Sequence, residues 1–265
     1  MITGLPCATR SRHPLRSGPY DDDVVDDGNG IRTLGILGAG RLGTVLARLA
    51  ASAGYRVLVA GSGSPAVISR AMAAVGATAA TTAQVVAEAD AVLLALPLGR
   101  YRSIPASMLD GTLVIDAMNY WWGDGIRDDL NDPRTSTSER VQAFLAGARV
   151  VKALGHMGYQ DVEDEARPAG EAGRKAIALA GDDPADVAAV ARLVDDLGFD
   201  PVVAGPLSAG IMFEPGAEAF GADVDADELR AMLDRFWTSQ RGIVVARARG
   251  LHPGGAGDVS GPPAP

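Results

Sequence analysis

The sequence has a single cysteine, Cys7, and it has few basic residues for its size. One cysteine excludes a disulfide within the chain, a cysteine-ligated metal cluster and dithiol redox chemistry. Lys and Arg number 24 against 33 Asp and Glu, so the net charge is −9. Because nucleic-acid binding depends on clustered positive side chains, this balance argues against a nucleic-acid partner. The sequence shows no metal-binding motif, and we expect no metal.

Long apolar runs are also missing. None reaches the roughly 18–20 residues that span a bilayer. The first residues, MITGLPCATRSRHPLRSG, lack the apolar stretch of a signal peptide. We therefore expect a cytoplasmic protein whose partners are small molecules rather than membranes.

The composition divides the 265 residues into four segments. Residues 1–31 are rich in Pro, Gly and acidic residues, and we interpret them as a disordered tail or an over-long start of the reading frame. Residues 32–150 are predicted to be a dinucleotide-binding domain and residues 151–250 a C-terminal part for substrate and dimerisation. Residues 251–265 resemble the first tail in composition.

Apolar runs alternate with amphipathic segments from residue 33 onward. Strands are expected in the runs 33–40, which enters a glycine turn, 55–63, 91–97, 112–119 and 150–155, and further apolar runs follow at 175–181 and 199–207. Helices are expected at 41–54, after Ser64-Pro65, at 139–147 with a capping box from Ser136, after Asp183-Pro184, and from Asp225 through Trp237. This alternation predicts an α/β fold: a Rossmann-type doubly wound parallel sheet with a smaller C-terminal α/β extension.

A glycine turn joins the first strand to the first helix. Gly38, Gly40 and Gly43 fit the pattern G-x-G-x-x-G, with Arg41 and Leu42 between them. The first glycine permits a tight turn, the second lets a pyrophosphate approach the backbone, and the third lets the helix pack on the strand. Because the motif follows a strand and opens a helix, we interpret it as a phosphate site rather than a plain glycine-rich turn.

The tip of the second strand bears on which dinucleotide is bound. NAD enzymes usually place Asp or Glu there, whereas this chain has Ser62 and Gly63. No Asp or Glu occurs from Gly28 through Ala87, in a chain that is otherwise acidic. A carboxylate would repel the extra phosphate of NADP, so NADP is expected. The alternative is that the absence of Asp and Glu from this stretch only reflects its alanine-rich composition.

These segments resemble the F-420-dependent NADP reductases. The likeness begins in GILGAGRLGTVLARLAASAGYRVLVAGS, continues through LLALP, VVKALGHMG, AGDD and LGFDPVVAGPLS, and covers about residues 32–210. It implies hydride transfer between NADP(H) and an 8-hydroxy-5-deazaflavin coenzyme, F-420, and a homodimer. It implies NADP contacts at the glycine turn, Ser62, Leu96 and Pro97, and a deazaflavin pocket near Gly155, His156, Met157 and Leu207.

The chain departs from this family at several positions. Relatives often have Arg directly after the serine and Lys shortly beyond, where this chain has Gly63 and Val67. Arg41 or Arg70 would then have to meet the extra phosphate. Gly155 stands where relatives often carry a larger polar residue. A changed second substrate is therefore an open alternative.

Several other side chains are candidates at the ligand-binding edge of the sheet. Asn119 ends a predicted strand there and is expected to contact the cofactor. His156, the only histidine outside the tails, is the candidate catalytic residue, with a buried structural histidine as the alternative. Trp121 and Trp122 would stack on a planar ring or cover the core. Met212 and Phe213 would line the pocket or pack in the core, and Lys152 would reach a phosphate or face solvent.

Two functions remain beside NADPH:deazaflavin hydride transfer. An NADPH-dependent imine or ketone reductase would need a proton donor, and its candidates are His156, Tyr120, Tyr159 and Lys152. A non-catalytic sensor would bind NADPH and turn over nothing.

Overall fold

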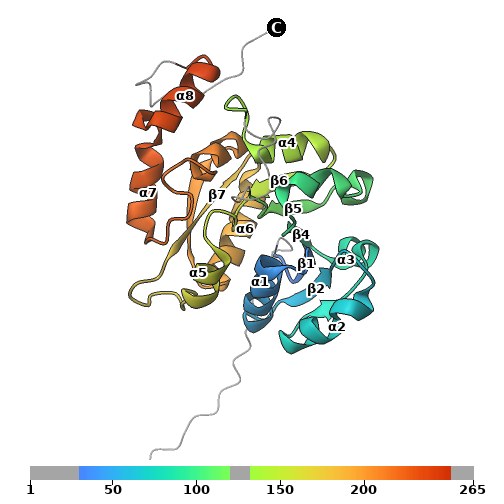
Figure 1. Ribbon diagram of the computed structural model, residues 1–265. Helices are drawn as coiled ribbons and strands as arrows, with labels where there is room; N and C mark the ends of the chain where they lie inside the picture. Colours follow the sequence, from blue (N-terminus) through green and yellow to red (C-terminus); the bar gives the residue numbers. More distant parts are fainter. Residues whose placement is uncertain (1–29, 120–131, 252–265) are drawn as a thin grey trace, which may run out of the picture.

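The computed structural model describes residues 30–119 and 132–251, and within them eight strands form one sheet (Figure 1). The strands are β1 (Thr33–Leu37), β2 (Arg56–Ala60), β3 (Thr78–Ala79), β4 (Ala91–Leu94), β5 (Leu113–Asp116), β6 (Arg149–Lys152), β7 (Ala176–Gly181) and β8 (Asp200–Gly205). Their order in the sheet is β3-β2-β1-β4-β5-β6-β7-β8. The first six are parallel and follow the 3-2-1-4-5-6 order of dinucleotide-binding folds. The predicted fold class is confirmed.

The C-terminal extension joins the same sheet through an antiparallel pair. Val151 and Lys152 of β6 lie opposite Gly181 and Ala180 of β7, and β8 then runs parallel to β7. The sequence analysis did not predict this reversal, since the apolar runs of β6 and β7 look alike. The expected boundary at residue 150 lies inside β6, which pairs with strands of both parts.

Helices cover both faces of the sheet. The helices are α1 (Arg41–Ser52), α2 (Pro65–Ala74), α3 (Thr82–Glu88), α4 (Thr137–Phe144), α5 (Tyr159–Asp164), α6 (Pro184–Asp196), α7 (Ala226–Asp234) and α8 (Gln240–Ala248). Short 3₁₀ segments are η1 (Leu98–Ser103), η2 (Ala106–Leu109), η4 (Leu207–Phe213) and η5 (Phe236–Thr238). Apolar side chains of α1, α2, α5 and α6 pack on one face, and those of α3, η1, η2 and α4 on the other. A third cluster joins β7 and β8 to η4, α7 and α8.

The predicted helix starts are confirmed. Ser136 Oγ accepts a hydrogen bond from the Glu139 amide at 3.1 Å, and Glu139 bonds back to the Ser136 amide, which completes a capping box. Asp183 caps α6 through the Ala185 amide, with Pro184 at the first helical position. These caps fix where α4 and α6 leave the sheet.

The long helix expected from Asp225 through Trp237 is wrong only in its last three residues. Helix α7 ends at Asp234, and Phe236 and Trp237 lie in η5. Ser239 then caps α8, and a Cβ on Gly242 would come within 1.9 Å of the Phe236 carbonyl oxygen. The chain therefore turns a tight corner that only glycine fits. The apolar spacing gave no sign of it, because it continues across both elements.

Candidate dinucleotide site

The glycine turn lies where the strand order reverses, between β1 and β4. A Cβ on Gly38, which has φ +126°, would come within 2.3 Å of the Ala95 carbonyl oxygen. A Cβ on Gly43 would come within 1.9 Å of the Gly38 carbonyl oxygen. A Cβ on Gly40, in contrast, would meet nothing within 4 Å. Gly38 and Gly43 are therefore needed by the fold, whereas Gly40 keeps open space beside the backbone, as an approaching pyrophosphate requires.

Helix α1 begins at this turn with its N-terminal amides uncapped by any side chain. Gly40 is the N-cap residue, and the first turn of α1 contains no acidic residue. The amides at a helix N-terminus and the positive end of the helix dipole favour an anion. The turn therefore fits the diphosphate of a dinucleotide on both steric and electrostatic grounds.

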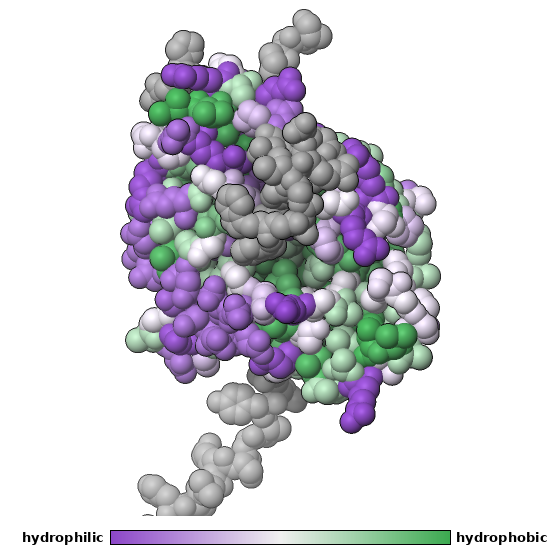
Figure 2. Space-filling model, viewed as in Figure 1, coloured by the Kyte–Doolittle hydropathy of each residue, from purple (hydrophilic) through white to green (hydrophobic). Residues whose placement is uncertain are grey.

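The tip of β2 carries no carboxylate. Ser62, Gly63 and Ser64 are exposed, and Ser64 Oγ accepts a hydrogen bond from the Ala66 amide at the start of α2. Val67, where relatives often have a lysine, is 80% exposed. On the face shown in Figure 2, hydrophilic side chains are dense around α5 and α7, whereas the side of α2 is largely neutral or apolar. This tip therefore exposes serine hydroxyl groups and no carboxylate.

Leu96, Pro97 and Asn119 follow β4 and β5 at the same edge of the sheet. Leu96 is half-buried, and Pro97 is exposed and precedes η1. Asn119 is 4% exposed, and its Nδ2 donates a hydrogen bond to the Gly155 carbonyl oxygen at 2.7 Å. The glycine turn, the β4 end and the β5 end therefore converge, and Asn119 also ties β5 to the segment after β6.

The segment after β6 is buried and tightly shaped. Leu154 has φ +60°, a conformation that costs a residue with a bulky side chain roughly 1–2 kcal/mol. A Cβ on Gly155 would come within 2.9 Å of the Ala117 carbonyl oxygen. The larger polar residue that relatives often carry at this position would not fit here without movement of the β5 end.

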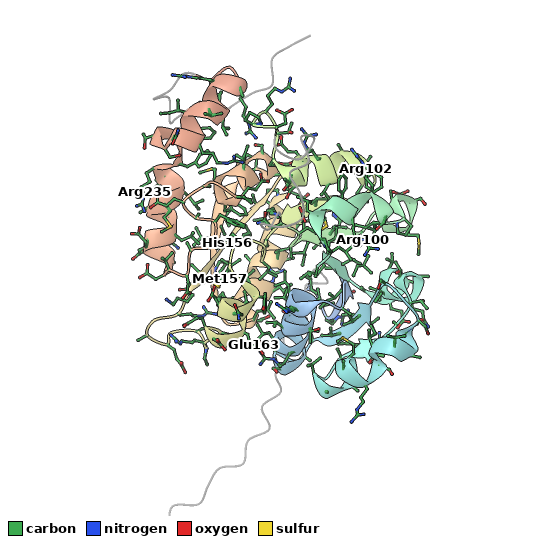
Figure 3. The ribbon with its side chains drawn as sticks, viewed as in Figure 1. Arg100, Arg102, His156, Met157, Glu163 and Arg235 are labelled. Atoms are coloured by element: carbon green, nitrogen blue, oxygen red, sulfur yellow. The ribbon has the colours of Figure 1, made fainter. Side chains whose placement is uncertain are left out.

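His156 does not face the dinucleotide site. Its side chain has no exposed surface; Nε2 accepts the Ala178 amide at 2.9 Å, so Nδ1 carries the proton and donates to the Ala219 carbonyl oxygen at 3.2 Å. Burial lowers the pKa of His156 to about 4. Figure 3 shows His156 and Met157 inside the molecule. The geometry supports the alternative of a structural histidine, and the catalytic role stays a prediction.

Met157, Leu207 and Phe213 are likewise enclosed. Each has at most 2% of its surface exposed, and Met212 has 8%. The Leu207 amide donates to Asp182 Oδ1 at 2.8 Å, so this backbone is tied down as well. The side chains expected to form a deazaflavin pocket therefore belong to the core. Tyr120, Trp121 and Trp122 lie outside the described residues.

A buried polar cluster lies at the ends of β5 and β6, where the sequence analysis expected Lys152 to reach a phosphate or face solvent and did not consider Asp116. Asp116 and Lys152 have no exposed surface, and the Lys152 ammonium lies 3.6 Å from Asp116 Oδ2. Ser138 Oγ donates to the same oxygen at 2.6 Å. Glu214 lies nearby and accepts hydrogen bonds from the Thr137 amide and hydroxyl; burial raises its pKa. The signal was present in the sequence, because LVID and VVK both end an apolar run with a charge.

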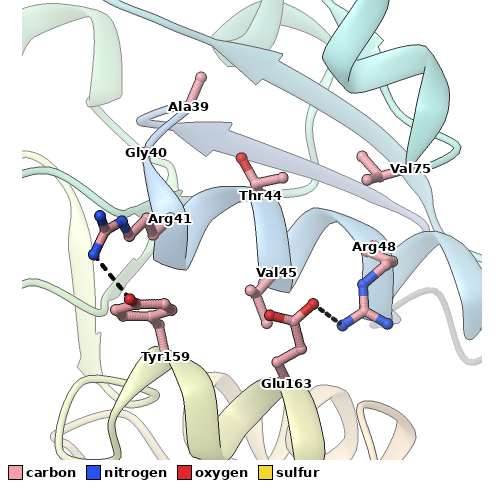
Figure 4. A pocket seen from close by; sticks show the side chains of 9 residues that line it. All are labelled: Ala39, Gly40, Arg41, Thr44, Val45, Arg48, Val75, Tyr159 and Glu163. Carbon is pink, nitrogen blue, oxygen red and sulfur yellow. Dashed lines mark hydrogen bonds and ion pairs between the residues drawn. The ribbon is translucent and has the colours of Figure 1, made fainter.

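An open groove of about 690 Å³ starts at the glycine turn and runs along α1 beside α5 (Figure 4). Arg41 Nη1 donates to the Tyr159 hydroxyl at 2.9 Å, and its guanidinium lies 5.4 Å from the centre of the Tyr159 ring. About two turns further along α1, Arg48 pairs with Glu163 at 3.1 Å. The Arg41 side chain is thus held toward α5.

Two further findings concern the described residues alone. They contain no group of His, Cys, Asp and Glu side chains that could hold a metal ion. None of their helices is long and apolar enough to cross a membrane.

The sheet order and the glycine turn together define a Rossmann-type dinucleotide-binding protein. Residues 33–120 match the model of a family described as NADP oxidoreductase, coenzyme F420-dependent. The resemblance inferred from the sequence is therefore confirmed over this segment.

Individual relatives agree with this placement. The protein YjhV of Escherichia coli (strain K12) is 35% identical over 91 residues, which are 34% of this chain and 64% of that protein. The hypothetical protein SMa0349 of Sinorhizobium meliloti is 28% identical, with a TM-score of 0.65, over 74% of this chain and 96% of that one. A protein of Arthrobacter sp. FB24, whose name suggests an F420-dependent NADP reductase, is 25% identical, with a TM-score of 0.57, over 79% of this chain and 94% of that one.

Proposed function

We propose that this protein transfers hydride between NADP(H) and an 8-hydroxy-5-deazaflavin coenzyme of the F-420 type. The observation that carries the proposal is the glycine turn, with its open space at Gly40, inside the segment that matches the F420-dependent family. When bound, NADPH supplies the hydride, and one proton from solvent completes the reduction of the deazaflavin ring.

The chain's own contribution is binding, orientation and exclusion of water. The uncapped N-terminus of α1 would hold the diphosphate, and the carboxylate-free tip at Ser62 and Gly63 would accept the extra phosphate of NADP. Leu96, Pro97 and Asn119 would border the nicotinamide. Transfer between two stacked rings needs the reacting carbons about 3–3.5 Å apart and little acid–base chemistry from the protein.

The buried state of His156 and Lys152 favours this reaction over imine or ketone reduction. That alternative needs a proton donor that touches the substrate, and neither side chain has exposed surface. Tyr159 is partly exposed, but its hydroxyl lies beside Arg41 at the diphosphate side of the glycine turn. Among the described residues, hydride transfer without a protein proton donor fits the site better.

The test is anaerobic oxidation of NADPH by the purified full chain, with deazaflavin coenzyme or a panel of imines and ketones as acceptor. We expect NADPH and the oxidised deazaflavin to disappear in equal amounts, and little turnover on the panel. Turnover of an imine or ketone alone would support the alternative enzyme. Tight NADPH binding without turnover on any acceptor would support the sensor. The implied homodimer is also a proposal, which sedimentation equilibrium of the same sample tests.

A further inference from the structure

Both backbone polar groups of Met118 are held by buried charged side chains. Asp116 Oδ1 accepts the Met118 amide at 3.0 Å, and the Lys152 ammonium donates to the Met118 carbonyl oxygen. Met118 lies two residues beyond the end of β5, so the sheet no longer supplies its hydrogen bonds. The Asp116 carboxylate and the Lys152 ammonium supply the hydrogen bonds that a neighbouring strand would otherwise make with Met118.

The next residues continue this restraint across to β6. Asn119 Nδ2 donates to the Gly155 carbonyl oxygen at 2.7 Å, and Gly155 follows the strained Leu154. The absence of a side chain at Gly155 is what lets its backbone approach Ala117. The ends of β5 and β6 are therefore locked to each other by four residues: Asp116, Met118, Asn119 and Lys152.

The four residues that join the ends of β5 and β6 lie near the half of the dinucleotide site that would hold the nicotinamide. In the sheet order β3-β2-β1-β4-β5-β6, the tip of β2 takes the adenosine ribose and the reversal between β1 and β4 takes the diphosphate. The ends of β4 and β5 lie on the other side of the reversal. They therefore border the nicotinamide half of a bound dinucleotide.

The burial of Lys152 and Asp116 is costly for stability alone. The free energy needed to remove two charges from water is often larger than the free energy gained from their attraction. Apolar residues of similar size commonly stabilise a fold equally well. The ammonium is also directed at a backbone carbonyl within hydrogen-bond reach, while the nearest carboxylate oxygen is 3.6 Å away. Lys152 therefore holds the backbone at Met118 more directly than it pairs with Asp116.

We propose that Lys152 and Asp116 are positioning residues that set Met118 and Asn119 for the nicotinamide half of NADP. The proposal rests on the proposed use of NADP(H), although it does not depend on which second substrate takes the hydride. Neither side chain touches the cofactor; both act through the backbone that precedes Asn119.

The test compares NADP⁺ with 2′-phospho-ADP-ribose, which lacks the nicotinamide, by titration calorimetry. The variant is Lys152→Met with Asp116→Asn, which removes both charges together and keeps an oxygen for the Met118 amide. We expect fragment affinity within about twofold of wild type, whereas NADP⁺ loses roughly fivefold or more because its nicotinamide contacts are misplaced. With the acceptor that wild type uses, kcat should fall roughly tenfold to a hundredfold.

A pair that serves only the fold gives a different result. The double variant would then bind NADP⁺ and the fragment in the wild-type ratio with wild-type kcat, and this would overturn the proposal. So would a wild-type protein that binds NADP⁺ no better than the fragment. A wild type that prefers NADP⁺ but reduces no deazaflavin would refute the proposed second substrate only, since the binding comparison needs no acceptor.

A measurement on wild type decides the matter if the double variant fails to fold. The Met118 amide should exchange its hydrogen slowly in the ligand-free protein, because Asp116 already holds it. Fast exchange that slows only when NADP⁺ binds would show that the segment is not set in advance, and the proposal would fail.

Discussion

Arg41 of α1 and Tyr159 of α5 meet beside the glycine turn, with the guanidinium 2.9 Å from the phenol oxygen and stacked over the ring. They come from the nucleotide-binding half and from the segment after β6, so the contact spans 118 positions of the chain. Arg41 directly follows Gly40, the residue that leaves space for the diphosphate. The contact therefore orients a positive charge next to the phosphate site.

The first prediction is that Tyr159→Phe weakens NADP⁺ binding by roughly twofold to tenfold. The change keeps the ring under the guanidinium but removes the hydroxyl that orients it, and an exposed hydrogen bond of this kind contributes about 0.5–1.5 kcal/mol. Titration calorimetry measures the effect. Glu163→Gln is the matched control, because it breaks the Arg48 pair further along the same groove. An equal loss in both variants would mean that the groove matters only for packing α1 on α5.

The second prediction separates two glycines of one turn. Gly40→Val should fold with at most about 1 kcal/mol loss of stability, because its side chain meets no protein atom and its backbone is extended. It should nevertheless abolish NADP⁺ binding by filling the space for the diphosphate. Gly43→Ala should lower the free energy of unfolding by about 1–3 kcal/mol, since its Cβ would overlap the Gly38 carbonyl oxygen. Thermal melts and calorimetry distinguish the two, and a Gly40→Val protein with normal affinity would remove the diphosphate from this turn.

The sequence predicted the nucleotide half of the fold well because its signals are local. The glycine turn, the Ser136–Glu139 capping box and the Asp183-Pro184 helix start each depend on residues a few positions apart. The reversal of β7 against β6 and the corner at Gly242 depend on contacts between distant segments. Apolar periodicity carries no information on strand direction, so it could not reveal them.

The difference between local and distant contacts also explains why the surroundings of His156 could not be predicted from the sequence. His156 follows a strand at the ligand edge, and position alone favoured a catalytic role. Its two ring partners come from Ala178 and Ala219, far along the chain, and they turn the ring into the core. For the same reason Asp116 was overlooked and Lys152 was expected at a phosphate or in solvent, since their shared partner Met118 is visible only when β5 and β6 are paired.

The third prediction concerns the choice between NADP and NAD. Ser62→Asp should weaken NADPH binding and reduce the difference in affinity between NADPH and NADH. The new carboxylate repels the extra phosphate and can bind a ribose hydroxyl. Val67→Lys is the reciprocal variant: it adds a positive charge at an exposed position of α2 and should strengthen NADPH binding roughly twofold to fivefold. Affinities for both dinucleotides at low and physiological salt measure this. A wild-type preference for NADH would show that the acid-free stretch reflects composition alone.

The fourth prediction is that His156 controls stability against pH rather than catalysis. Its pKa is about 4 in the folded protein and 6.5 in the unfolded chain, so the unfolded state takes up the proton first as the pH falls. Stability should be complete above about pH 6.5 and decline between pH 6.5 and 4, by roughly 3 kcal/mol in total from this group. Denaturant unfolding across this range measures the decline.

The variant that isolates this effect is His156→Gln, whose side chain does not titrate. It should be less stable than wild type at pH 7.5, because it replaces a ring that satisfies two backbone groups and packs against Phe213. Its stability should also fall less steeply than that of wild type between pH 6.5 and 4, and the difference between the two curves is the contribution of His156. Because the ring touches no part of the dinucleotide site, the folded variant should keep NADP⁺ affinity and kcat within about twofold of wild type. A loss of kcat beyond tenfold in a fully folded His156→Gln protein, with unchanged pH dependence of unfolding, would return His156 to the active site.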